Sequence, residues 1–288
     1  PEFFDHAVAI ASSEDKGTSE MGLSLIKLAI EDFSAASTPA RGSPPLTISR
    51  RRELRNGIIA TLPKIVPILI GTFRSSMEEM QNAIRVNGRC QIGLEILDQL
   101  ISWAPLRDYL NDDLFSCIFA LAGTPSCAQS ATAVSCLSAI INRNCMPPDE
   151  SQFILGLAGE IMQILSEVLN LGAANIATLD DHYLQRLTDF LKTFLTRHLR
   201  RFETNTSFDM QAFLTLLYRF VLALQSPDAF VDALDVWSIF AVYVRNNKLS
   251  VPRQDMYTQG LVQLSGNILE KMLFKTSSDL LSMLDDVE

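Results

Sequence analysis

The chain has 288 residues, of which 48% are hydrophobic, so it is long enough to fill a large continuous core. Its 33 acidic and 24 basic residues give a formal net charge of −9, which argues against a nucleic-acid-binding surface spread over the whole molecule. No apolar run reaches the roughly 18 uninterrupted residues of a membrane span, and the start lacks the order of a secretory signal, so we expect a soluble intracellular chain without membrane insertion.

The first half of the chain predicts helices, because its apolar residues recur at steps of three and four rather than in strict alternation. Pro63 and Pro67 are expected to kink or split the second helix, and Gly172 to end the sixth. The predicted segments are Glu20–Phe33, Ser49–Arg74, Arg89–Ala104, Asp112–Ala122, Ser126–Ile141 and Glu150–Leu171.

The second half shows the same pattern more clearly. A stripe of leucine and phenylalanine from Tyr183 to Leu199 predicts an amphipathic helix, and Asp180 or Asp181 can cap its first turn. Ser226 followed by Pro227 predicts another helix start, because serine caps free N–H groups and proline fits the first turn. The remaining predicted helices carry the apolar stripes of residues 213–224, 230–244 and 256–274.

Pairing consecutive predicted helices, beginning with Glu20–Phe33, gives about five antiparallel pairs, the arrangement of HEAT-type helical repeats. The expected fold is therefore an all-α, HEAT-like α-solenoid, with one closed helical bundle as the alternative. We expect one continuous segment over residues 1–288, with loop breaks near 35–48, 74–89 and 172–180. The chain begins at Pro1 and stops directly after a helical pattern, which suggests a piece of a larger protein.

The sequence offers no arrangement of residues typical of catalysis or metal binding. The cysteines stand among apolar neighbours, which favours buried thiols over disulfides. Zinc ligands need short local spacings, and neither the cysteines nor the three histidines have them. Asp180 and Asp181 beside His182 fit a helix cap better than an acid–base pair, and single scattered glycines do not form a phosphate loop. We therefore expect no enzyme activity and no cofactor. The cysteines and histidines are Cys90, Cys117, Cys127, Cys136, Cys145, His6, His182 and His198.

Two arginine clusters are candidate protein-partner contacts. Each can also be an ordinary solvated surface, and the second complements the dipole at the end of its helix. Guanidinium groups pair carboxylates through two parallel hydrogen bonds, so an acidic patch on a partner protein suits them. Aromatic residues do not alternate with these arginines, so nucleic acid is a poor partner. The clusters are Arg50, Arg51, Arg52 and Arg55, and Arg197, Arg200 and Arg201.

Several ordered blocks resemble the exportin-6 family of the importin-β superfamily. The strongest runs from Leu179 to Glu203 and contains TDFL and HLRRFE. The long Ser/Pro-rich insertion associated with this family after the second helix is not evident between Arg74 and Arg89. The other blocks are EDFSAAS (31–37), TISRRREL (47–54), SWAPL (102–106), NRNCMP (142–147), FLTLLYRF (213–220) and LDVWSIFAVYV (234–244).

The resemblance implies an export receptor that binds RanGTP and protein cargo together in the nucleus and releases both in the cytoplasm. It further implies a profilin–actin type of cargo, contacts with nucleoporins, and shuttling between nucleus and cytoplasm. The main Ran contacts of this superfamily would lie in repeats that precede Pro1. A HEAT-repeat scaffold or regulatory subunit unrelated to transport is the alternative, and an enzyme is a distant third.

Overall fold

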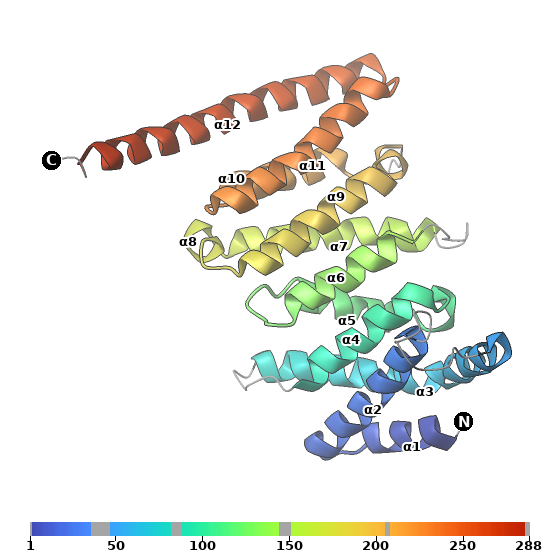
Figure 1. Ribbon diagram of the computed structural model, residues 1–288. Helices are drawn as coiled ribbons and strands as arrows, with labels where there is room; N and C mark the ends of the chain where they lie inside the picture. Colours follow the sequence, from blue (N-terminus) through green and yellow to red (C-terminus); the bar gives the residue numbers. More distant parts are fainter. Residues whose placement is uncertain (1, 36–46, 82–87, 144–150, 205–207, 286–288) are drawn as a thin grey trace. The chain divides into compact units, whose positions relative to one another are not determined.

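The computed structural model describes residues 2–35, 47–81, 88–143, 151–204 and 208–285 (Figure 1). Every regular element among them is a helix, as the sequence pattern predicts. The chain divides into two compact units, Pro1–Ile154 and Leu155–Glu288. The expectation of one continuous segment over residues 1–288 stays a prediction.

In the first unit, helices pack in two layers. The helices α1, α3 and α5 lie side by side in one layer, and α2, α4 and α6 lie side by side in the other. Across the layers, α1 packs on α2, α3 on α4, and α5 on α6, so each helix buries its apolar stripe against its neighbours. The bounds are α1 Glu2–Ala11, α2 Lys16–Ala35, α3 Ile48–Gln81, α4 Gly88–Trp103, the short 3₁₀ helix η1 Leu106–Asp108, α5 Asp112–Ala122 and α6 Ser130–Ile141.

The second unit repeats this alternation. The helix α9 packs beside α11 and α10 beside α12, while α11 also contacts α10 and α12. Helices that touch only near neighbours along the chain are the defining feature of an α-solenoid, so the predicted fold class is confirmed. The bounds are α7 Ser151–Asn170, α8 Ala173–Ile176, α9 Asp181–Glu203, α10 Met210–Ala223, α11 Pro227–Asn246 and α12 Val251–Asp285.

The predicted pairing of the helices in the first unit is wrong, because the sequence pattern did not reveal α1. Phe4, Ala7 and Ala11 are buried and one helical turn apart, so the signal was present but short. A Cβ atom added to Gly22 of α2 would lie 2.2 Å from the backbone nitrogen of Ala11, which shows how closely α1 and α2 approach. The partner of α2 is therefore α1, not α3, and the next pairs are α3 with α4 and α5 with α6.

The two prolines of α3 do not split it, contrary to one expectation. The helix continues from Ile48 to Gln81 through Pro63 and Pro67. Both prolines lie on the exposed side, where water can hydrate the carbonyl groups that lose their N–H donors, while Leu62 and Leu69 are fully buried on the opposite side. Packing of this buried face offsets the cost of the missing hydrogen bonds.

The predicted caps at Asp180 and Ser226 and the stop at Gly172 are correct, whereas α3 continues to Gln81 and α12 already begins at Val251. The Asp180 side chain accepts a hydrogen bond from the His182 N–H, and the Ser226 hydroxyl accepts one from the Ala229 N–H. Gly172, at φ 79°, follows the end of α7. The helix predicted from Ser126 instead begins at Ser130, because Cys127 first takes part in a turn in which its N–H bonds the Thr124 carbonyl.

The core contains many of the residues that the apolar stripes assign to it, although Met272 of the 256–274 stripe is 51% exposed. Phe194 and Trp237 are buried, at 1% and 7% exposed. The described cysteines, Cys90, Cys117, Cys127 and Cys136, carry free thiols and are buried, while Cys145 lies outside the described residues.

One stretch of α3, Arg52–Met80, is long and apolar enough to cross a membrane by length and composition. Half of its most apolar window is buried, and α3 packs against α1, α4 and α5. These contacts are those of a core helix in a folded unit.

Candidate functional site

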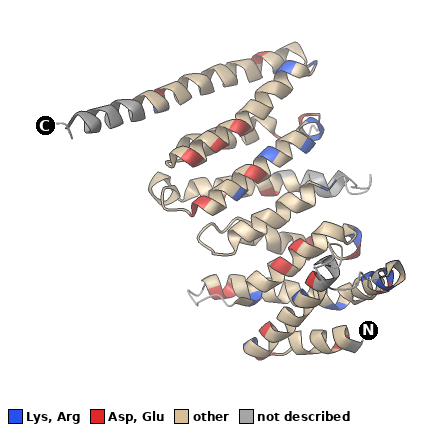
Figure 2. Cartoon of the chain, in the orientation of Figure 1, with Lys and Arg blue, Asp and Glu red and all other residues tan. Residues whose placement is uncertain are grey.

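The end of α9 carries the stronger of the two predicted arginine clusters. The buried stripe of α9 includes Leu195, His198 and Phe202, which leaves Arg197, Arg200 and Arg201 on the exposed side of the helix. Figure 2 shows basic residues gathered where α9 ends. The positive charges also complement the partial negative charge of the helix C-terminus.

The backbone at this helix end is closed by Thr204. Its N–H donates to the Arg200 carbonyl at 3.2 Å, and its hydroxyl donates to the same carbonyl at 2.9 Å. These bonds satisfy a carbonyl group that an open helix end would leave to water or to a basic side chain. The Arg200 carbonyl therefore has its partner in Thr204.

A buried carboxylate joins the end of α9 to the start of α12. The Glu203 side chain is 5% exposed and accepts a hydrogen bond from Arg253, which also donates to the Glu203 carbonyl at 3.0 Å. Burial first, and the nearby Glu203 carboxylate second, raise the pKa of Tyr243 and of Tyr257. This contact holds the end of α9 against the start of α12. Removal of Arg253 would be costly, because the Glu203 charge would then be buried without its partner.

Further arginines that the sequence pattern did not group with the cluster lie close to it. Tyr243 of α11 is within electrostatic reach of Arg200 and Arg253, and the exposed Arg245 follows it by two residues. Because α9 and α11 run side by side, the arginines at their C-terminal ends lie near one another and their positive charges reinforce each other. We call this group the basic end; it consists of Arg197, Arg200, Arg201, Arg245 and Arg253.

At the opposite ends of the same two helices the charge is negative. Asp181 and His182 of α9 and Asp228 and Asp232 of α11 line a cavity of about 280 Å³. Acidic side chains favour helix N-termini and basic ones favour C-termini, which explains why the charges separate along α9 and α11. Midway, Lys192 pairs with Asp235 across the two helices at 3.1 Å. The paired helices therefore present an acidic end and a basic end.

The second arginine cluster lies in the first unit, at the start of α3, and Arg50 and Arg55 have structural partners. Arg50 pairs with Glu53 at 3.1 Å. The Arg55 guanidinium lies 5.9 Å from the centroid of the Trp103 ring and donates to the Trp103 carbonyl at 3.4 Å. Arg52 is exposed, and the side chain of Arg51 lies outside the described ones. Arg55 thus helps to hold α3 against the end of α4, which makes this cluster the weaker candidate.

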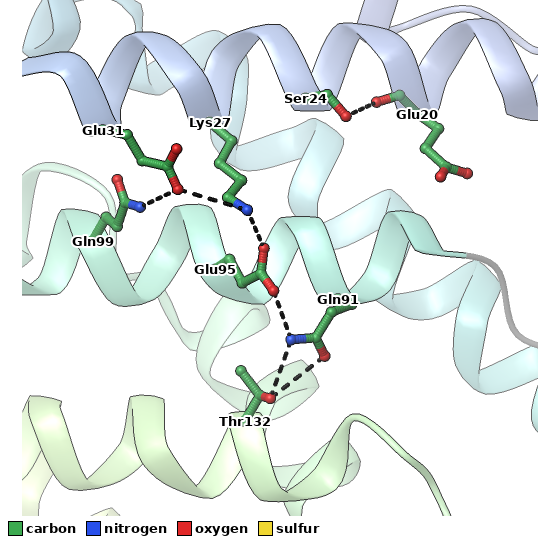
Figure 3. A network of polar contacts seen from close by, with 8 residues as sticks. All are labelled: Glu20, Ser24, Lys27, Glu31, Gln91, Glu95, Gln99 and Thr132. Carbon is green, nitrogen blue, oxygen red and sulfur yellow. Dashed lines mark hydrogen bonds and ion pairs between the residues drawn. The ribbon is translucent and has the colours of Figure 1, made fainter.

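A polar network crosses α2, α4 and α6 in the first unit (Figure 3). Lys27 of α2 pairs with Glu95 of α4 at 2.6 Å, and Gln99 donates to Glu31 at 3.0 Å. Gln91 links Glu95, at 2.9 Å, to Thr132 of α6, at 3.4 Å. Sequence spacing gave no sign of the contacts between helices in this network, because each joins residues that are far apart along the chain. Its side chains hold one another, so the network connects successive repeats.

The largest pKa shifts belong to buried thiol and phenol groups, which stay protonated at neutral pH. Burial raises the pKa of the Cys90 thiol to about 12 and also raises the pKa of the Tyr109 and Tyr183 hydroxyls. In the part of the chain that the structure describes, no group of three or more His, Cys, Asp or Glu residues is placed to hold a metal ion.

No protein-family model matches the chain. Curated relatives named exportin-6 do match it, in several species. The protein of Dictyostelium discoideum is 29% identical over 196 residues (66% of this chain, 18% of the relative). The Homo sapiens protein is 26% identical over 231 residues (68% and 20%), and the Danio rerio protein is 22% identical over 364 residues (99% and 32%).

These matches confirm the resemblance to exportin-6 that the ordered sequence blocks indicate. The chain spans less than a third of the length of each of these relatives. The region aligned with the Danio rerio protein is also longer than this chain, so that relative has insertions that this chain lacks.

Proposed function

We propose that this chain is a segment of a nuclear export receptor that binds protein cargo together with RanGTP and shuttles between nucleus and cytoplasm. The observation that supports the proposal most is the similarity to exportin-6 of several species, which extends over 66% to 99% of the chain. The all-helical stacking within each unit is the architecture expected of such a receptor. The cargo that the family resemblance suggests is of the profilin–actin type.

Binding rather than bond chemistry is the activity that this architecture supports. Each helix buries one face against near neighbours and leaves the other exposed, so a partner can contact several successive repeats. Small shifts between repeats change the surface offered to a ligand, and a ligand that prefers one arrangement stabilises it. In this way RanGTP bound to one part of the receptor can favour cargo bound to another.

Within this segment we assign the basic end as the contact for an acidic patch of the cargo. Arg200 and Arg201 are exposed, and Thr204 caps the backbone next to them. An arginine binds a carboxylate with two parallel hydrogen bonds, which fixes the orientation of the partner. The main contacts to Ran belong to repeats outside this segment, and nucleoporins are further partners of the receptor.

The test is affinity purification of the full-length protein from nuclear extract, with and without Ran locked in its GTP state. Profilin and actin should be enriched only with RanGTP. Equal recovery of partners without Ran would favour a helical scaffold outside transport instead.

The assignment of the basic end is tested by the Arg200→Glu/Arg201→Glu double variant in the same experiment. Cargo recovery should fall, because like charges now face the acidic patch, while helicity by circular dichroism stays unchanged. Arg107→Glu serves as the control, because Arg107 is a largely exposed arginine in the other unit. Unchanged recovery with the double variant would refute the assignment.

A further inference from the structure

The helices α10 and α12 enclose a cleft that the basic end does not include. Gln211, Leu214 and Tyr218 of α10 face Met256 and Gly260 of α12 across a volume of about 410 Å³. This volume is within the range of about 300–1,000 Å³ typical of sites for small ligands and side chains. The cleft lies wholly within the second unit.

One end of the cleft is closed by polar contacts between the same two helices. The Asn267 side-chain amide donates to the Tyr218 hydroxyl, and the Lys271 ammonium group donates to the carbonyls of Leu222 and Leu224. Lys271 also lies 4.4 Å from the centroid of the Phe230 ring. These contacts hold the C-terminal part of α10 against α12, so the opening lies toward the N-terminal parts of both helices.

Aromatic rings from α11 and α12 line the cleft. Trp237 packs edge-on against Phe240, with ring centroids 5.9 Å apart, and Phe240 packs edge-on against Tyr257 at 5.2 Å. Such mutually packed rings are held in place before any ligand arrives, which lowers the entropic cost of binding. The cleft thus has a rigid apolar wall.

The rest of the lining is uncharged. Gln211, Gln259 and Gln263 supply side-chain amides, and none of the described residues that line the cleft is acidic or basic. A ligand that carries a phosphate or carboxylate would lose its hydration here without gaining an ion pair. Glutamine amides both donate and accept, so they match the N–H and C=O groups of a peptide backbone.

A buried donor in this wall lacks an acceptor. Trp237 is 7% exposed, and its indole N–H has no hydrogen-bond partner among the described residues. A buried N–H group without a partner is costly, and in proteins such a group calls for a specific explanation. A carbonyl oxygen brought by a ligand would remove that cost on binding.

We propose that this cleft binds an uncharged apolar peptide segment of a partner protein. An apolar side chain of the segment fills the space between α10 and α12, and a backbone carbonyl accepts the hydrogen bond of the Trp237 indole N–H. The neutral amide-rich lining, the aromatic wall and the unpartnered indole donor each match one of these features. The proposal does not depend on the transport function or on the basic end.

Two glycines of α12 provide a matched pair of variants. A Cβ atom at Gly260 or at Gly266 would meet no atom within 4 Å, so a side chain can be added at both positions without a clash at its first carbon. Gly260 lines the cleft, whereas Gly266 does not. Gly260→Leu should therefore fill the cleft, and Gly266→Leu should leave it open.

The experiment selects a phage-displayed library of random twelve-residue peptides on the full-length protein. Recovered sequences are then made as fluorescein-labelled, end-capped peptides and titrated by fluorescence anisotropy. The selected peptides should share uncharged apolar positions. Gly260→Leu should weaken their binding by about tenfold or more, the factor that corresponds to about 1.4 kcal/mol, while Gly266→Leu leaves it within about twofold.

Trp237→Phe keeps a ring in the wall but removes the donor, so it provides a second test. Binding should weaken by about fivefold, which is typical of one lost hydrogen bond, while the melting temperature of the free protein stays equal or rises. Circular dichroism checks that each variant is folded, and Trp237→Phe decides the question if Gly260→Leu does not fold.

Several results would overturn the proposal. These are the absence of a common motif, selection of acidic or basic peptides, or equal binding to wild type and to both cleft variants. Self-association in analytical ultracentrifugation that Gly260→Leu abolishes would assign the cleft to a second copy of the chain, and would equally refute it.

Discussion

Replacing Gly22 with alanine has two opposing effects on the stability of the folded protein. In a solvent-exposed helix this change stabilises by up to about 1 kcal/mol, because alanine restricts the unfolded chain more than glycine does. At Gly22, however, the new Cβ would lie 2.2 Å from the Ala11 nitrogen and 2.5 Å from the Ala11 Cα. Both are backbone atoms, which cannot rotate away, so α1 as a whole must move.

The second effect should dominate. Overpacking of a tight contact costs about 1–3 kcal/mol, and a displaced α1 also loses packing of Phe4 and Ala7, which are buried. The buried hydrogen bond from the Ser19 hydroxyl to the Ala11 carbonyl, 2.8 Å long, would lengthen as well. We expect a net destabilisation of the α1–α2 contact by about 2 kcal/mol.

Amide hydrogen exchange and thermal unfolding measure this effect. Protection in α1 should fall by about 30-fold, the factor that corresponds to about 2 kcal/mol. Gly71→Ala is the control, because no atom lies within 4 Å of a Cβ placed there, and this variant should be as stable as wild type or more so. If Gly22→Ala behaves like Gly71→Ala, the close approach of α1 and α2 is refuted.

Other predictions concern ionisation, reactivity and the core. Burial alone would raise the pKa of Glu95, but hydrogen bonds from Lys27 and Gln91 lower it. The stabilisation from Glu95 is therefore present above its unfolded pKa of about 4.3 and is lost as the pH falls through the folded value. The difference of about 0.5–1 kcal/mol between wild type and Glu95→Gln, measured by urea unfolding, should shrink below that pH, and a constant difference would contradict it. The Cys90 thiol, with a pKa raised to about 12 by burial, should resist iodoacetamide at pH 8 in the native protein and react after denaturation, as mass spectrometry can show; rapid native labelling would contradict its burial. Phe194→Ala should cost about 3–5 kcal/mol in thermal unfolding, since the ring is 1% exposed, and a loss below about 1 kcal/mol would contradict its core position.

The sequence by itself determined most of the helices, the caps at Asp180 and Ser226, and the resemblance to exportin-6. The period of the apolar residues reports which face of a helix is buried, and the side chains of Asp180 and Ser226 cap helices through bonds to residues a few positions away. These are local effects, so they can be read without a fold. The arginine cluster at the end of α9 was visible for the same reason.

Only the tertiary structure decided which helices pair. An apolar stripe shows that a helix needs a partner but does not identify it, and the pairing changed once α1 occupied the face of α2. The Glu203–Arg253 contact and the Lys27–Glu95 contact were equally hidden, since each joins residues that are far apart in sequence. The cleft at Trp237 exists because α10, α11 and α12 meet there, and no single helix encodes it.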